Sequence, residues 1–134
     1  MTKLNNHKTV VLALLIIGYI SALFIESSQP PLQILGEIKG LDKVAHFLAF
    51  TFLGLLMCAL SFKLHPRPKI QLFSMPLLIV IVLGILEESY QMLIPGRASE
   101  FMDLFADTCG ALFAILIANR IAHIMRTKNL IRLD

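Results

Sequence analysis

The chain has 134 residues and fits a single domain. Hydrophobic residues make up 57% of it, and the mean hydropathy of +0.77 is high for a water-soluble fold. The net charge is only +3, and most basic residues lie near the ends of the long apolar segments, where they act as topology signals and lipid contacts. No nucleic-acid partner is therefore expected.

Four apolar segments, at residues 9–25, 44–62, 70–86 and 104–124, predict helices that cross a membrane. At about 1.5 Å per residue each segment is roughly 25–32 Å long, close to the hydrocarbon thickness of a bilayer. A soluble bundle of unusually apolar helices is the less favoured alternative. The sequence predicts an all-α fold, a four-transmembrane-helix bundle formed by one domain over residues 1–134. The predicted spans cover residues 9–25, 44–62, 70–94 and 100–124.

The basic residues predict the orientation of this bundle. If four spans put both termini on one side, the other side holds only Lys39, Lys43 and Arg97. Cytoplasmic loops carry the excess of Lys and Arg, so both termini are expected to be cytoplasmic. The first span follows two lysines as a signal peptide would, but it lacks a small-x-small cleavage site, so an uncleaved anchor is favoured. The basic residues on the side of the termini are Lys3, Lys8, Lys63, Arg67, Lys69, Arg120, Arg126, Lys128 and Arg132.

The segment from residue 87 to residue 107 is unusually polar for its place between two spans. Residues three or four apart share a face of a helix, which pairs Glu88 with Gln91 and Asp103 with Asp107. The same spacing pairs Asp42 with His46 in the second span. The predicted topology puts all of these groups at the outer end of the bundle. We therefore expect an outward-facing polar site formed by Asp42, His46, Glu88, Gln91, Arg97, Asp103 and Asp107.

Asp107 is the member of this set that is hardest to explain by a structural role. It lies about two turns inside the fourth span, where an ionised group should face the bundle interior and find a partner. His46 and Arg97 are both candidates for that partner. The third helix is expected to end near Ile94, and Pro95-Gly96 to form a type II turn.

Other polar groups have simpler interpretations. Asp42 can act as the N-cap of the second helix and Ser99 as that of the fourth. Glu87 is expected to reach headgroup water, and Glu100 to complement the helix dipole. The segment 32–41 repeats an apolar residue at every third position, which suits either a helix on the outer membrane surface or a loop with apolar anchors.

The cofactor question stays open at the level of the sequence. The polar site has more carboxylates than basic groups, and carboxylates, an amide and a histidine are acceptable ligands for Mg²⁺, Mn²⁺ or Zn²⁺. No dense ligand motif is present. The candidate metal ligands are His46, Glu88, Asp103 and Asp107.

Small residues recur at every fourth position of the fourth span, and in lipid they let two helices approach closely. The seam is expected to pack inside the chain's own bundle, and a homo-oligomer is the alternative. Its members are Ala106, Gly110, Ala114, Ala118 and Ala122.

Four short motifs in this order resemble the VanZ-like family: Lys43-x-x-His46-Phe47, Glu88-x-x-Gln91, Pro95-Gly96-Arg97 and Asp103-x-x-x-Asp107-x-x-Gly110. Many members carry Asn at the position of Asp107, where the added charge here favours a salt bridge or a cation contact. The resemblance implies a small multi-pass protein of the bacterial cytoplasmic membrane and adds Lys43 to the site. The family is named for a protein associated with low-level resistance to the glycopeptide teicoplanin.

Three functions compete at this point. The first is a non-enzymatic protein whose site binds a lipid-linked or cell-envelope ligand and alters envelope properties or glycopeptide susceptibility. The second is a membrane enzyme that acts on a polyprenyl or lipid phosphate, with or without the help of a metal ion, and has His46, Glu88 and Asp107 as candidate catalytic groups. The third is a purely structural network between helices. The partners expected are membrane lipids and an envelope precursor.

Overall fold

The computed structural model describes residues 2–30, 38–64, 74–97 and 100–131. These residues form four helices and no strand: α1 (Thr2–Ser27), α3 (Leu41–Leu64), α4 (Ser74–Gln91) and α5 (Phe101–Ile131). All four are long and apolar enough to cross a membrane, over His7–Ser27, Leu41–Leu64, Ser74–Gln91 and Phe101–Met125. The predicted all-α fold with four spans is confirmed.

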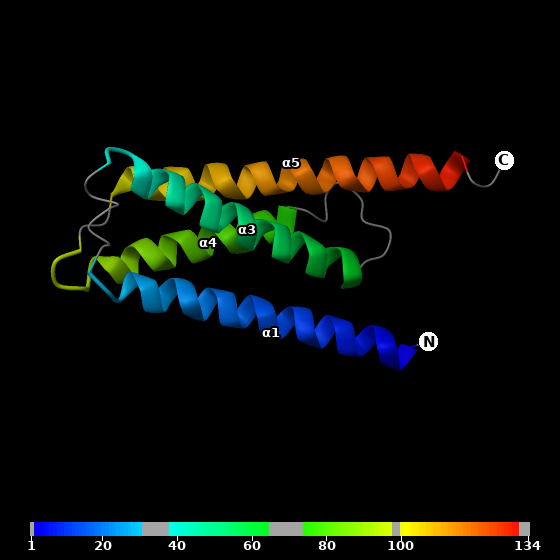
Figure 1. Cartoon of the computed structure of the whole chain (residues 1–134), viewed down its shortest axis with the longest axis horizontal. Coiled ribbons are helices and arrows are strands. Elements are labelled where there is room, and N and C mark those ends of the chain that lie inside the picture. Colours follow the sequence, from blue (N-terminus) through cyan, green and yellow to red (C-terminus); the bar gives the residue numbers. More distant parts are fainter. Residues whose placement is uncertain (1, 31–37, 65–73, 98–99, 132–134) are drawn as a thin grey trace.

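The helices lie side by side, with α3 and α4 between α1 and α5 (Figure 1). The N-terminal end of α1 and the C-terminal end of α5 lie at one end of the bundle. The C-terminal ends of α1 and α4 and the N-terminal ends of α3 and α5 lie at the other, which we call the polar end. Because of this arrangement, polar residues that are far apart in the sequence meet there.

Several helix ends differ from the sequence-based prediction. Helix α4 ends at Gln91 and not at Ile94, because the N–H groups of Leu93 and Ile94 bond to carbonyls three residues back, at 2.9 and 3.0 Å. Pro95, which disfavours a helical residue before it, follows directly. Helices α1 and α5 continue past the apolar segments, since polar residues can extend a helix into the interface.

The turn after α4 and the start of α3 both depend on a glycine. Arg97 N–H bonds to the Ile94 carbonyl at 3.1 Å and Gly96 has a φ of 83°, which confirms the type II turn. Asp42 is not an N-cap, because α3 begins at Leu41 and the Gly40 carbonyl accepts the N–H of Val44 at 3.2 Å. The predictions for Ser99 and for most of segment 32–41 lie outside the described residues.

Helices α3 and α5 approach each other most closely. A Cβ at Gly54 would lie 2.7 Å from the Cβ of Ala114, and a Cβ at Gly110 would lie 2.3 Å from the Phe47 carbonyl oxygen. Thr51 Oγ1 donates to the Gly110 carbonyl at 3.2 Å. The small-residue seam of α5 is therefore used inside the chain, against α3, and a homo-oligomer through it stays an untested alternative.

The middle of the bundle is apolar, and an aromatic residue of α1 bonds to it. Phe50, Leu53, Val80 and Ala111 form the buried core. On α1, the Tyr19 hydroxyl donates to the Ala49 carbonyl at 3.1 Å. Large apolar side chains elsewhere on all four helices are exposed, as expected of surfaces that face lipid.

Candidate functional site

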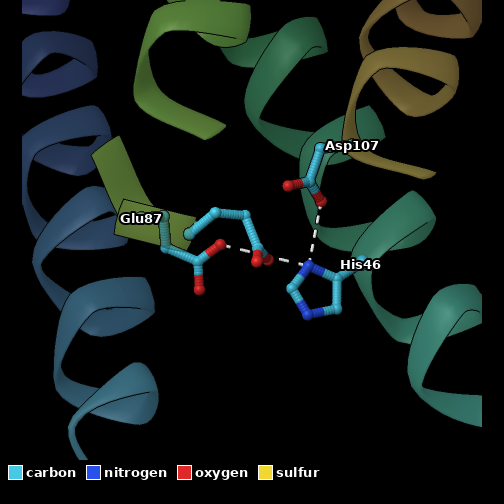
Figure 2. A group of neighbouring side chains, drawn as sticks. His46, Glu87 and Asp107 are labelled. Carbon is cyan, nitrogen blue, oxygen red and sulfur yellow. Dashed lines mark hydrogen bonds and ion pairs between the residues drawn. The ribbon is translucent and has the colours of Figure 1, made fainter. Parts of the chain in front are cut away.

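The polar end holds a buried group of ionisable side chains from three helices, which we call the inner cluster. It consists of His46 on α3, Glu87 and Glu88 on α4, and Asp107 on α5. His46 Nδ1 lies 3.0 Å from Asp107 Oδ1 and 4.0 Å from Glu87 Oε2. Figure 2 shows the His46 ring joined to both carboxylates. The side chain of Asp107 is 0% exposed, that of Glu87 5% and that of His46 17%.

Glu87 is a member of this cluster and does not reach headgroup water, so that prediction is wrong. Its Oε1 accepts a hydrogen bond from Ser27 Oγ on α1 and one of 2.6 Å from Gln91 Nε2. Gln91 Nε2 also donates to Ser27 Oγ at 3.3 Å. The four-residue spacing from Glu87 to Gln91 was a signal for this contact, but nothing in the sequence identified Ser27.

A second polar group surrounds the ammonium of Lys43, and we call it the Lys43 cluster. Lys43 Nζ lies 2.7 Å from Asp42 Oδ2, 2.6 Å from Glu100 Oε2 and 2.8 Å from Asp103 Oδ1. The Asp103 side chain is 8% exposed, whereas that of Glu100 is 55% exposed. This cluster ties the first turn of α3 to the start of α5. Glu100 thus pairs with a lysine, in addition to its place beside the helix N-terminus.

Arg97 does not join the inner cluster. Its Nε donates to the Gln29 carbonyl at 2.8 Å, and its Nη2 donates to the carbonyl and to Oε1 of Glu26, both at 2.8 Å. These acceptors lie at and just after the C-terminal end of α1, where carbonyl groups lack partners within the helix. Arg97 therefore links the end of α1 to the turn after α4. Of the two candidate partners of Asp107, the structure shows that His46 contacts it.

The chain matches a known protein family over most of its length. The VanZ/LLP1 family model matches residues 3–123, which is most of the chain. The chain belongs to the VanZ/LLP1 family. No curated protein and no solved structure matches it.

The family assignment confirms the resemblance inferred from the motifs, and the structure of this VanZ/LLP1 protein shows where the motif residues lie. His46, Glu88, Gln91 and Asp107 come together at the inner cluster. Three other predicted site residues, Asp42, Lys43 and Asp103, belong to the Lys43 cluster. Arg97 belongs to neither cluster. Gly110 belongs to the close contact with α3 that lies one turn below Asp107.

The polar end of this VanZ/LLP1 protein carries an excess of acidic side chains. The inner cluster has three carboxylates and one imidazole, and Lys43 is the only basic side chain among the three carboxylates of the Lys43 cluster. At an effective dielectric constant of about 20, two like charges roughly 4 Å apart repel by about 4 kcal/mol. A cation held among the three buried carboxylates of the inner cluster would offset this repulsion.

This arrangement limits what the site can do chemically. The guanidinium of Arg97 and the ammonium of Lys43 are both already paired with carboxylates, so a bare phosphate would meet repulsion at the inner cluster. Carboxylates and an imidazole are instead suited to hold a cation. The contact between His46 and Asp107 also orients the imidazole, as a general acid or base requires.

Proposed function

We propose that this VanZ/LLP1 protein binds a lipid-linked ligand of the bacterial cell envelope at its polar end, and thereby influences envelope properties and susceptibility to glycopeptides such as teicoplanin. The observation that carries the proposal is the inner cluster itself. Ionisable groups buried within spanning helices are costly, and in membrane proteins they usually serve binding or transport. The part of the ligand that meets the cluster must be cationic or reach it through a bound cation.

The location we propose is the cytoplasmic membrane, with the polar end on the extracytoplasmic face. Lys8 is near the start of α1, Lys63 is in the last turn of α3 and Arg120 is in the C-terminal half of α5. These parts of the three helices point to the end of the bundle opposite the inner cluster. Because Lys and Arg are concentrated on the cytoplasmic side of membrane proteins, this distribution supports an outward-facing site.

A lipid tail on the ligand is supported by an apolar groove of about 500 Å³ between α1 and α3. Leu14 and Gly18 line it from α1, and Phe52 and Leu56 from α3. The groove also includes Tyr19, which lies eight residues and so about 12 Å along α1 from Ser27 of the polar end. A ligand with its headgroup at the polar end could place its hydrocarbon chain in this groove.

Mass spectrometry of lipids that co-purify with the protein in native-membrane particles tests this proposal. His46→Ala should reduce recovery of the bound lipid by altering the headgroup site. Gly18→Leu should reduce it by filling the groove, since a Cβ at Gly18 would have no atom within 4 Å. Ser21→Ala, on an exposed part of α1, is the matched control and should change nothing.

Equal recovery of the same lipids from the wild type, His46→Ala and Gly18→Leu would overturn the proposal. In cells, deletion of the gene should change envelope composition or teicoplanin sensitivity, and the wild type should restore it. The His46→Ala variant should not.

A second candidate is a membrane enzyme that acts on a polyprenyl or lipid phosphate, favoured specifically by the oriented His46–Asp107 pair. Incubation of purified protein with polyprenyl phosphates and Mg²⁺ tests it. Product formation that is lost in His46→Ala supports an enzyme, and unaltered substrate or equal turnover by that variant argues against it.

A further inference from the structure

We propose that the inner cluster is a binding site for one divalent transition-metal ion, with His46, Glu87, Glu88 and Asp107 as its ligands. This proposal differs from the sequence-based metal candidates, because Glu87 replaces Asp103. It goes beyond the proposed function, since the ion would bind whether or not a lipid ligand is present.

The first argument is the spacing of the possible ligand atoms. Each of the four residues offers one such atom, and these atoms all lie within 4.8 Å of one another. For bonds of about 2.1 Å, octahedral ligand atoms lie about 3.0 Å apart when adjacent and about 4.2 Å apart when opposite. His46 Nδ1 lies 3.0 Å from Asp107 Oδ1 and 4.0 Å from Glu87 Oε2, which matches both separations.

The second argument is independent and concerns carboxylate oxygens that accept no hydrogen bond. Glu87 Oε2 and Asp107 Oδ2 are both buried and make no hydrogen bond. Buried polar atoms of native proteins nearly always have a hydrogen-bond partner, and a site for an ion is one of the accepted reasons for an exception. Glu87 directs the unsatisfied Oε2 at the imidazole of the same cluster.

The surroundings of Glu87 fit a metal ligand as well. Ser27 and Gln91 both donate to its Oε1, which fixes the carboxylate and leaves Oε2 on the side of His46. Hydrogen bonds of this kind, from residues around the ligands, hold metal-binding carboxylates in position. The Lys43 cluster, by contrast, already holds the ammonium of Lys43 at its centre, and we assign no metal to it.

The ligand types indicate which ions would bind. One imidazole with three carboxylates suits Mn²⁺ and Zn²⁺ better than Ca²⁺, which prefers oxygen ligands alone. Zn²⁺ should displace Mn²⁺, because affinities of divalent ions for such sites rise along the first transition series.

The test is a titration of the full-length protein in detergent, stripped of metal by a chelator, with Mn²⁺ followed by electron paramagnetic resonance. The wild type should bind a single ion per chain, and Zn²⁺ should release it. His46→Ala and Glu87→Gln should each weaken binding by roughly tenfold or more. Glu100→Gln is the control, since Glu100 is exposed and belongs to the Lys43 cluster, and its affinity should equal that of the wild type.

A second measurement on the wild type guards against variants that fail to fold. Pulsed resonance of the bound Mn²⁺ should show coupling to a nitrogen nucleus of His46. Absence of saturable binding, absence of that coupling, or loss of binding in Glu100→Gln with retention in His46→Ala would overturn the proposal. The Mn²⁺ titration does not measure lipid binding, so its failure would leave the proposed function standing.

Discussion

Gly110 and Phe47 meet backbone to backbone, so closely that a Cβ on Gly110 would lie 2.3 Å from the Phe47 carbonyl oxygen. Each of them is a near neighbour of a site residue: His46 precedes Phe47, and Asp107 lies one turn before Gly110. The close approach of α3 and α5 therefore sets the 3.0 Å contact between His46 and Asp107. Gly110, which is not a member of the inner cluster, thus determines the distance between His46 and Asp107.

Gly110→Ala should separate α3 from α5 and destabilise the bundle. A methyl group forced into a packed contact costs about 1–3 kcal/mol, and here its neighbour is backbone that cannot rotate away. Unfolding in sodium dodecyl sulfate, followed by circular dichroism, measures the loss. Gly18→Ala is the control: its Cβ meets no atom within 4 Å, so stability should stay equal or rise by up to about 1 kcal/mol. Equal stability of both variants would contradict the close contact.

The fold was predictable from the sequence because long apolar segments and helical spacing are local properties. They identified the four spans and the alignment of Asp103 with Asp107. They also made His46 a candidate partner of Asp107. The type II turn could also be predicted, because the preference of Pro95-Gly96 for it is local.

The parts that the sequence did not predict depend on contacts between helices. In a membrane, lipid-facing side chains are as apolar as the core, so hydrophobic periodicity does not reveal which face of α4 is buried. That is why Glu87 was assigned to headgroup water although its side chain is only 5% exposed. Arg97 was misplaced because its acceptors, Glu26 and Gln29, come from α1 and the residues after it, a long way back in the chain.

Ser27→Ala should destabilise the protein and loosen α1 at the polar end. The variant removes one of the two donors to the buried carboxylate of Glu87, and hydrogen bonds to such groups are worth about 1–3 kcal/mol. Denaturant unfolding measures the change, with Ser21→Ala as the matched control. Ser21 Oγ bonds only its own helix, at the carbonyl of Ile17, and is exposed, so its removal should change stability little. Equal effects of the two substitutions would show that Ser27 does not hold Glu87.

Arg97→Lys should weaken the attachment of α1 while leaving the inner cluster intact. A lysine ammonium lacks the planar fork that reaches the acceptors on Glu26 and Gln29 together, so a loss of about 1–3 kcal/mol is expected. Glu26→Gln, which keeps both carbonyl contacts, should cost less. Unfolding and Mn²⁺ titration are measured on the same samples. Normal stability with lost Mn²⁺ or lipid binding would instead place Arg97 in the site.

The sidedness of the inner cluster is open to a direct test by cysteine labelling. In a background where the native Cys58 and Cys109 are replaced by alanine, Lys8→Cys and Lys39→Cys place one exposed thiol at each end of the bundle. A membrane-impermeant maleimide should label Lys39→Cys in intact cells and Lys8→Cys only after permeabilisation. The reason is that the end of the bundle with both chain termini carries the excess of Lys and Arg, which favours the cytoplasmic side. The reverse pattern would put the inner cluster on the cytoplasmic side. An extracytoplasmic envelope ligand could then not reach it, and the proposed function would have to be abandoned while the metal site would not.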